Sequence, residues 1–205
     1  TILSTSQMLD PRTKRIDPEL IGAIGLREER FGRYVNPSDK VGVLTPEIQK
    51  MTGAGPVPVV AVAGHDTGAA VAAVPAQNQN FAYLSCGTWS LLGIETKDAI
   101  INEKSFQYNF TNEGGIEGTT RFLKNICGMW LLERCRQEWT DAPADVNQIN
   151  SDAMTAPAFR SLINPDDPRF ANPESMTKAI SEFCQETGQP VPQNYKEFAR
   201  CIFES

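Results

Sequence analysis

Two short helices and one buried strand are the elements that the hydrophobic pattern predicts for the first third of the chain. "DPELIGAIG" and "TPEIQKMTG" each place a capping residue, Asp17 or Thr45, before a proline. "PVPVVAVAG" is a continuous apolar, β-branched run, which is typical of a strand buried on both faces of a parallel sheet. "GAAVAAV" directly behind it predicts a helix. A buried strand that turns into a helix is where α/β sheets present ligand-binding groups.

The pattern changes after the polar stretch "PAQNQN" at residues 75–80, where we expect a domain junction. "FAYLSCGTWSLLGIET" predicts a strand, a glycine turn and a second strand. "SFQYNFTNEGGIEGTTRFL" predicts a further strand or a hairpin around Gly114 and Gly115. Apolar residues at steps of three and four then predict a helix from Leu123 to Trp139.

Residues 140–172 contain interrupting prolines and predict an irregular connection. A helix is expected from Asn172 to Gly188, with Met176, Ile180 and Phe183 on its buried side. The last segment, "NYKEFARCIFES", predicts an amphipathic helix without a stop signal. Because its apolar face needs a partner, we expect the chain to be a piece of a longer protein.

Charge and composition exclude several classes of function. The chain carries 19 Lys and Arg against 25 Asp and Glu, so it lacks the basic surface of a protein that binds nucleic acid. It has neither an apolar run of roughly 20 residues nor a secretory signal pattern, which predicts a cytoplasmic protein with no membrane partner. Five cysteines without a C-x-x-C pair argue against a disulfide framework or a structural zinc site. Cys184 and Cys201, on two predicted helices, could face one another.

His65-Asp66-Thr67 follows the apolar run and has two interpretations. Asp66 or Thr67 could simply cap a helix that begins near Gly68. Alternatively, a carboxylate kept ionised at a helix N-terminus, an end that also attracts phosphate, could take a proton from a hydroxyl group. His65 is the single histidine, so no His/Asp metal cluster can form around it, and we expect an orienting or packing role and no metal site.

Two further groups of residues also allow a structural and a functional interpretation. Gly87 predicts a hairpin turn, but a glycine also lets a phosphate approach the backbone, where Ser85 and Thr88 would add hydroxyl donors. "NEGG" at 112–115 is most simply a turn. Asn125, near the start of the predicted helix, is a local cap or a solvated side chain, or its amide contacts sugar hydroxyls.

In this order and spacing, the stretches resemble the FGGY family of carbohydrate kinases. The resemblance covers nearly the whole chain and runs through "STSQMLD", "VAVAGHDTGAAV", "YLSCGTWSLLG", "TNEGGIEG", "LKNICGMWLLERC" and "INPDDPRF". It implies an α/β fold of the ribonuclease-H-like, actin and sugar-kinase superfamily, in which two domains close over a cleft. Residues 1–78 would be the end of the first, sugar-binding domain. Residues 79–205 would be the beginning of the second, nucleotide-binding domain, which is truncated.

The resemblance also implies roles for single residues on the sugar side of the cleft. Asp66 resembles the base that deprotonates the attacking sugar hydroxyl. His65 and Thr67 resemble neighbours of the substrate, and Asn125 resembles a substrate contact supplied by the second domain.

On the nucleotide side, Gly87 and Thr88 resemble the phosphate turn that contacts ATP. Glu133 stands where the family commonly carries a glutamine that contacts ATP, so the chain departs from the pattern there. The family's first phosphate loop and its later adenosine-binding turn do not occur in these 205 residues, and we expect the isolated chain to be inactive.

The activity implied by the resemblance is phosphorylation of the 1-hydroxyl of a ketose by ATP with Mg²⁺. L-Rhamnulose is the ketose that the resemblance favours, and L-fuculose is an alternative. A non-catalytic relative that binds sugar or nucleotide, and a purely structural domain, are rival interpretations from other classes of function.

Overall fold

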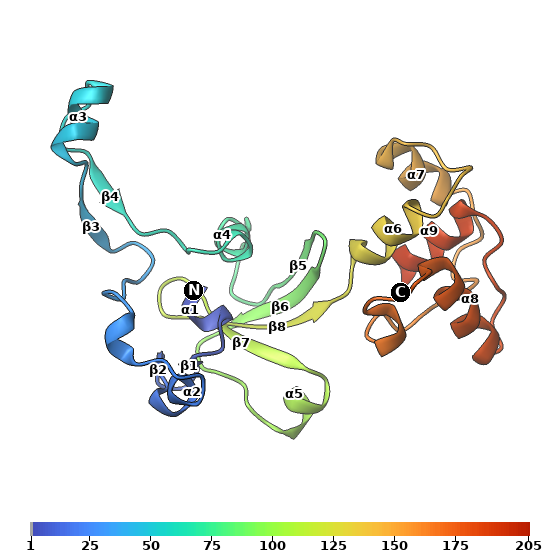
Figure 1. Cartoon of the computed structure of the whole chain (residues 1–205), viewed down its shortest axis with the longest axis horizontal. Helices are drawn as coiled ribbons and strands as arrows, with labels where there is room; N and C mark the ends of the chain where they lie inside the picture. Colours follow the sequence, from blue (N-terminus) through green and yellow to red (C-terminus); the bar gives the residue numbers. More distant parts are fainter. Residues whose placement is uncertain (1) are drawn as a thin grey trace. The chain divides into compact units, whose positions relative to one another are not determined.

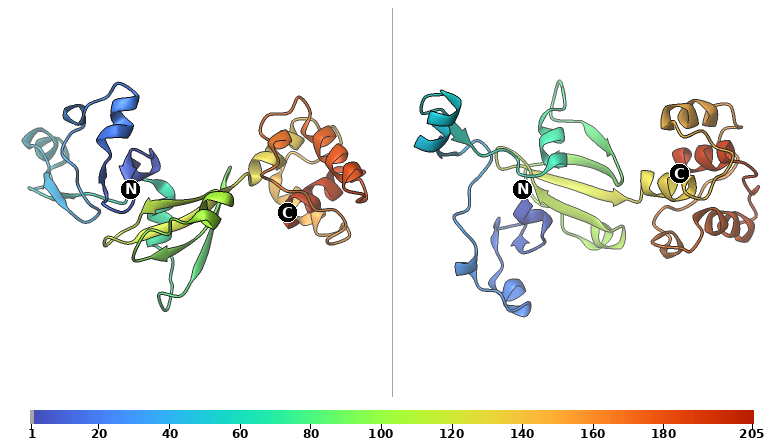
Figure 2. Two further views of the ribbon diagram at one scale, coloured as in Figure 1. Left: turned by 90° about the horizontal axis from the view of Figure 1, so that it is seen from below. Right: turned by 45° about the horizontal axis from the view of Figure 1, so that its top comes forward.

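The computed structural model describes residues 2–205, which form two compact units (Figures 1 and 2). The first unit contains the described residues up to Ser85 together with Leu91–Lys124. The second contains Cys86–Ser90 and Asn125–Ser205. Helices and strands are mixed along the chain, as predicted, and the pairs β1–β2, β3–β4 and β7–β8 are antiparallel.

Short elements make up the part of the first unit before residue 75. β1 pairs with β2 and β3 pairs with β4, both in antiparallel two-stranded sheets. In chain order the elements are α1 (Ile2–Thr5), β1 (Leu9–Asp10), β2 (Arg15–Ile16), α2 (Pro18–Ala23), η1 (Glu28–Arg30), β3 (Lys40–Val43), α3 (Pro46–Thr52), β4 (Pro58–Val60) and α4 (Asp66–Ala72).

The capping signals of α2 and α3 are confirmed. The Asp17 carboxylate accepts hydrogen bonds from two main-chain amides in the first turn of α2. The Thr45 hydroxyl accepts one from the amide of Ile48 in α3, and Gly53 ends that helix with a φ of 71°. Local chemistry sets both helices because the capping groups bind amides that would otherwise lack partners.

The predicted parallel, doubly buried strand at "PVPVVAVAG" is wrong. β4 spans only Pro58–Val60, pairs antiparallel with β3, and is exposed along its whole length. Val59 and Val60 are 40% and 50% exposed. An apolar run shows that a strand can be buried, but burial also requires other elements packed on both faces of its sheet. Among the described residues, β4 pairs with β3 alone, in a sheet of two strands.

A four-stranded sheet with the order β5-β6-β8-β7 forms the rest of the first unit and continues into the second. One face of it packs against α4 through a buried cluster of Val71, Tyr83, Leu91 and Leu123. The elements are β5 (Ala82–Cys86), β6 (Ser90–Thr96), α5 (Glu103–Gln107), β7 (Phe110–Gly114) and β8 (Thr120–Ile126). The strand-turn-strand prediction for residues 81–96 and the hairpin around Gly114 are therefore confirmed.

Two boundaries in this sheet differ from the predictions. "NEGG" is not a turn, because residues 112–114 are the last of β7. The segment from Leu123 to Ile126 is not the start of a helix but the end of β8. Its spacing of apolar residues suits a helix, yet Leu123 pairs with Thr111 of β7 and is completely buried. Pairing with a distant strand overrides the local pattern.

Four helices build the second unit: α6 (Met129–Arg136), α7 (Val146–Ala153), α8 (Met176–Glu186) and α9 (Tyr195–Glu204), together with the short η2 (Pro168–Phe170). They enclose one hydrophobic core, whose fully buried members include Ile149, Phe170, Met176 and Ile180. α8 begins later than predicted, at Met176, because Ser175 is its cap.

Two expectations about this helical part are wrong. Residues 140–172 are not entirely irregular, because α7 forms there with Asp145 as its cap and Ile149 and Ala153 as its buried side. The apolar face of α9 does not lack a partner, since Phe198, Ala199 and Ile202 lie in the core of the same unit. Periodicity identified the face of α9, but it could not show that α6 and α7 would cover it.

The five cysteines are free thiols, and all except Cys86 are buried. Cys184 and Cys201, which could face one another, are both buried in the helical core with no disulfide between them, and burial raises the pKa of each thiol. None of the described helices is long and apolar enough to cross a membrane.

Candidate active site

Asp66 is the first residue of α4 and presents its carboxylate to solvent. Its side chain is 94% exposed, while Thr67 and Gly68 behind it are buried. The main-chain amide of Thr67 donates a 2.7 Å hydrogen bond to Oδ1 of Asp66. Neither Asp66 nor Thr67 caps the helix, because His65 occupies the capping position without a side-chain bond. The carboxylate is therefore oriented by one amide and open to a ligand.

His65 lies beside this carboxylate. Its Nε2 atom is 3.4 Å from Oδ1 of Asp66, and its side chain is 25% exposed. The other ring nitrogen, Nδ1, is buried and has no hydrogen-bond partner among residues 2–205. Gly64, with a φ of 70°, makes the bend that brings the chain into this turn. The three residues predicted from "HDT" thus form one continuous group at the start of α4.

The predicted phosphate turn joins β5 to β6 and is held by the beginning of α6. The carbonyl oxygen of Gly87 accepts a 3.3 Å hydrogen bond from the amide of Met129. The carbonyl oxygen of Thr88 accepts one of 3.1 Å from the amide of Trp130. Gly87 and Thr88 are themselves exposed. The backbone of the turn is consequently bonded to α6, while Gly87 and Thr88 are accessible to a ligand.

Gly128 allows this contact and was missed by the sequence analysis. A Cβ atom at position 128 would overlap the hydroxyl oxygen of Ser90, and it would also lie 3.0 Å from both the Cβ and the main-chain nitrogen of that residue, which is tighter than most real Cβ contacts. Only glycine lets the start of α6 approach the turn so closely. The signal that could have identified it is a glycine directly before a helix, in "NICGMW".

Asn125 and Glu133 lie near the ends of the elements that follow the sheet. Asn125 is exposed, one residue before the end of β8, rather than near a helix start as predicted. Glu133 is in the middle of α6, and its carboxylate binds Nη1 of Arg136 at 2.7 Å. Arg136 also donates to the carbonyl oxygen of Ala144. The negative charge of Glu133 is therefore paired with a cation in the same helix.

The predicted site residues are divided between the two compact units. His65, Asp66 and Thr67 belong to the first unit. Gly87, Thr88, Asn125 and Glu133 all belong to the second. Each group is exposed enough to reach a ligand, apart from Thr67, whose side chain faces the interior.

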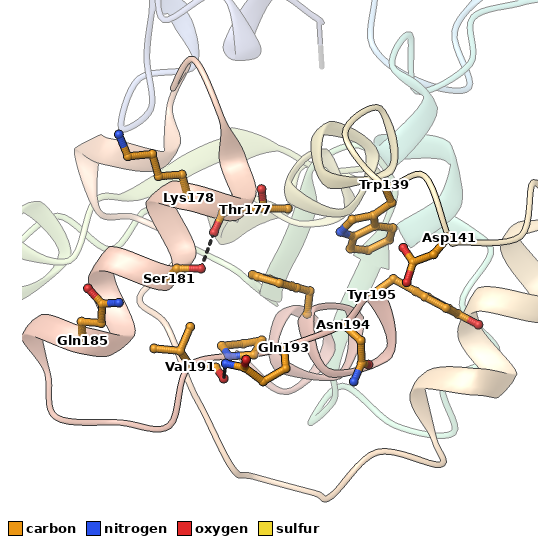
Figure 3. Close-up of a pocket in the computed structure, with 12 residues that line it drawn as sticks. Trp139, Asp141, Thr177, Lys178, Ser181, Gln185, Val191, Gln193, Asn194 and Tyr195 are labelled. Atoms are coloured by element: carbon orange, nitrogen blue, oxygen red, sulfur yellow. Dashed lines mark hydrogen bonds between the residues drawn. The ribbon is translucent and has the colours of Figure 1, made fainter.

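A groove of about 530 Å³ also lies in the second unit (Figure 3), but it contains none of these residues. Trp139 and Tyr195 form one side of it, and α8 forms the other. Several of its polar groups already bind the chain itself: the Ser181 hydroxyl donates to the carbonyl oxygen of Thr177, and that of Tyr195 donates to Asp152. The groove therefore supplies few free groups for recognising a ligand.

Curated relatives match the chain along its whole length. A protein called rhamnulokinase from Bacteroides thetaiotaomicron is 58% identical over all 205 residues, which correspond to 42% of that relative. A rhamnulokinase from Pectobacterium atrosepticum is 46% identical over the same residues, or 40% of its length. The chain thus spans about two fifths of the length of these relatives.

A family model and solved structures agree with this result. Residues 82–205 match the model described as "FGGY family of carbohydrate kinases, C-terminal domain". A ligand-bound xylulose kinase from Lactobacillus acidophilus aligns with 74% of the chain and 30% of its own, at a TM-score of 0.57 and 17% identity. A structure titled as a xyloylose kinase from Brucella ovis aligns with 90% of the chain and 44% of its own, at a TM-score of 0.57 and 15% identity. The solved structures show a shared fold.

Proposed function

This chain belongs to the FGGY family of carbohydrate kinases, and we propose that the full-length protein phosphorylates the 1-hydroxyl of a ketose with Mg-ATP. The ketose that we propose is L-rhamnulose. The 58% identity to a protein called rhamnulokinase, extending over every residue of the chain, supports this choice above other ketoses. The observation that carries the chemistry is the exposed carboxylate of Asp66 at the start of α4.

The domain arrangement is part of the proposal. Residues 1–78 would end a first, sugar-binding domain and residues 79–205 would begin a second, nucleotide-binding domain, both ribonuclease-H-like. The match of residues 82–205 to a C-terminal domain model supports a boundary close to residue 78. In such an enzyme the ligands would bind between the two domains.

Asp66 is proposed as the general base. Its carboxylate would take the proton of the ketose 1-hydroxyl while the hydroxyl oxygen forms a bond to the γ-phosphorus of ATP. The bond between the γ-phosphorus and the bridging oxygen breaks in the same step, and ADP leaves. Because the transition state of phosphoryl transfer is loose, positioning contributes more than the strength of the base. The bond from the Thr67 amide orients the carboxylate for this role.

Gly87 and Thr88 are proposed to contact the phosphates of ATP, and Asn125 to contact the sugar, with His65 and Thr67 beside it. An amide side chain suits a sugar because it both donates and accepts hydrogen bonds. Mg²⁺ would enter as part of the nucleotide substrate, held largely by phosphate oxygens. Within the described residues, no group of three or more His, Cys, Asp or Glu side chains could hold a metal ion by itself.

An assay of ADP release by the full-length protein tests the proposal. L-Rhamnulose, L-fuculose and D-xylulose would each be supplied with Mg-ATP, and the sugar phosphate would be identified by mass spectrometry. We expect turnover with L-rhamnulose and its loss in the Asp66→Asn variant. A wild-type protein whose melting temperature rises with ketose or ATP but which forms no ADP would be a non-catalytic relative.

A further inference from the structure

A buried ion pair joins β7 to β8 on the face of the sheet that packs against the preceding segments. Nη2 of Arg121 lies 2.8 Å from Oε2 of Glu113, and the two residues are direct partners in the antiparallel register. Their side chains are 1% and 8% exposed. A buried ion pair is seldom more stabilising than an apolar pair of the same size, so its presence here calls for another explanation.

The pair is attached to α1. The hydroxyl of Thr5 donates a 3.3 Å hydrogen bond to Oε2 of Glu113, across 108 residues of sequence. Next to it, the amide of Gly114 donates a 2.8 Å bond to the hydroxyl of Ser4. Nε of Arg121 donates to the carbonyl oxygen of the same glycine. Both strands and the first helix therefore meet at one hydrogen-bonded cluster, and Figure 1 shows α1 beside the end of β7 and the start of β8.

The same face of the sheet carries α4. Arg121 and Leu123 are two residues apart on β8 and so point to the same side. Leu123 packs with Val71 of α4 and with Tyr83 of β5. The Tyr83 hydroxyl is buried, without a hydrogen-bond partner in the described part of the chain. Its burial raises the pKa of Tyr83 to about 12, with Arg121 and Glu113 both close enough to affect it.

We propose that Arg121 and Glu113 are positioning residues for the kinase reaction. Their hydrogen bonds hold α1 against β7. In this way they also keep in place the face of the sheet that packs against α4, the helix that begins at Asp66. Neither side chain touches Asp66, so the effect passes through the packing of α1 and α4 on the sheet. This inference rests on the proposed function of Asp66. It goes further because it assigns a role to charges that the proposed chemistry does not use.

The physical reason lies in the direction of the bonds. An apolar pair would fill the space equally well, but it would let α1 slide, whereas the Arg121–Glu113–Thr5 chain of hydrogen bonds allows one arrangement. A misplacement of about 1 Å can reduce the rate of an enzyme by a factor on the order of 100. When the ketose hydroxyl is misplaced, water can attack the γ-phosphorus instead. The bond to the bridging oxygen breaks as before, giving ADP, inorganic phosphate and a proton.

Steady-state kinetics of full-length variants test the inference, with ADP and sugar phosphate measured separately. The main variant is Arg121→Met, and Arg121→Lys is its conservative partner, which keeps the charge. Arg200→Met is the matched control, because Arg200 forms an ion pair with Glu204 that is also largely buried, 14% and 10% exposed, but lies in α9. Thr5→Val removes only the hydroxyl donor to Glu113, and Ser6→Ala is its control, since the exposed Ser6 hydroxyl binds within its own turn.

For Arg121→Met we expect kcat to fall by about tenfold or more and the ratio of ADP to sugar phosphate to rise above one. Arg121→Lys should recover part of both values. Thr5→Val should change both in the same direction, by less, and it remains informative if Arg121→Met does not fold. Arg200→Met should lower the melting temperature with a ratio that stays at one. Equal ratios in Arg121→Met and Arg200→Met, at similar losses of melting temperature, would overturn the inference.

Hydrogen exchange separates this inference from the proposed function. Amides of Asp66–Ala72 should exchange faster in Arg121→Met and Thr5→Val than in the wild type, and at the wild-type rate in the two controls. Unchanged exchange in α4 rejects the positioning contact, whatever the kinetics show. If the wild-type protein makes no sugar phosphate, but α4 still exchanges faster in Arg121→Met and Thr5→Val than in the wild type, the proposed reaction is rejected while the positioning contact is supported.

Discussion

The main-chain amide of Trp130 donates a 3.1 Å hydrogen bond to the carbonyl oxygen of Thr88. This bond, together with the one from Met129 to Gly87, uses amides of the first turn of α6 that have no partner within the helix. The turn between β5 and β6 and the helix that carries Glu133 are therefore fixed to one another. A change that separates the turn from α6 should lower the stability of the fold and weaken the binding of any ligand to the turn.

Gly128→Ala is expected to separate the turn from α6. The added Cβ would overlap the hydroxyl oxygen of Ser90 and lie 3.0 Å from its main-chain nitrogen, and overpacking of this kind costs about 1–3 kcal/mol. We expect a lower melting temperature and a higher KM for ATP in the full-length protein. Gly22→Ala in α2 is the control, because a Cβ there meets nothing within 4 Å and a helical alanine is favoured over glycine. Equal melting temperatures for the two variants would contradict the prediction.

Asp66→Asn should lower kcat of the full-length protein by a factor of about 10²–10⁴, which is the usual contribution of a positioned general base. The KM for ATP should change little, because the amide keeps the shape of the side chain and the proposed phosphate turn is a separate segment. Coupled measurement of ADP release checks both values. Turnover of the Asp66→Asn variant close to that of the wild type would remove Asp66 from the mechanism.

Glu133→Gln should lower the KM for ATP if this side chain lies near the nucleotide, because it removes a negative charge that repels phosphate. Stability should change by less than about 1 kcal/mol, since the Glu133 carboxylate is 54% exposed and its pair with Arg136 lies at the surface. Arg136→Met is the opposite change: it leaves the charge of Glu133 unpaired and should raise the KM for ATP. If the KM for ATP in both variants equals that of the wild type, Glu133 lies away from the nucleotide.

The carboxylate of Glu138 should make the stability of the helical unit depend on pH. It accepts hydrogen bonds from the amides of Met176 and Thr177 at the start of α8 and from the hydroxyls of Ser175 and Thr177. Burial opposes ionisation, but these four bonds together hold the pKa of Glu138 below its usual 4.5. A group with a lowered pKa in the folded state stabilises the fold above its unfolded pKa, and this is lost as the pH falls through the folded pKa.

We therefore expect Glu138→Gln to lower the melting temperature at pH 7, by an amount equivalent to about 1–3 kcal/mol. The difference from the wild type should shrink as the pH is taken below 4.5. Glu182→Gln in α8 is the control, because its 3.8 Å pair with Lys178 is exposed at the surface. Calorimetry at a series of pH values checks this, and a difference that stays constant below pH 4 would contradict it.

Cys86 should react with alkylating reagents much faster than the other four cysteines. It is exposed, whereas burial raises the pKa of Cys201 to about 12 and also raises the pKa values of Cys127, Cys135 and Cys184. The thiolate is the reactive form, so the raised pKa values of the four buried thiols and their limited access to reagent both slow their alkylation. Brief alkylation at pH 8 followed by peptide mass spectrometry should label position 86 first. Rapid labelling of Cys184 or Cys201 in the folded protein would contradict the burial of these two thiols.

The sequence correctly predicted those elements that are set by interactions between residues close together in the chain. Asp17 and Thr45 bind amides within three residues, and the apolar side of α9 repeats at helical spacing, so a single sequence reveals them. Long-range pairing decided the remainder. Leu123 has a helical pattern but lies in β8 opposite Thr111, and Val59 has the pattern of a buried residue but is exposed.

The residues of the candidate site divide in the same way. "HDT" and "CGT" could be selected from sequence because acids, hydroxyls and glycines at the ends of predicted strands are the chemistry of a ligand site. Gly128 could not be selected, since its importance depends on Ser90 lying against it. Arg121 and Glu113 could not be paired either, because their contact follows from the register of β7 and β8.

The sequence by itself therefore determined the caps of α2 and α3, which residues carry reactive groups and which family pattern they follow. Only the tertiary structure decided that Thr5 reaches Glu113 and that Arg121 is buried with it. The physical reason is that caps and periodic faces depend on neighbours a few residues away. A buried charge is stable only where the fold brings its partner from a distant part of the chain.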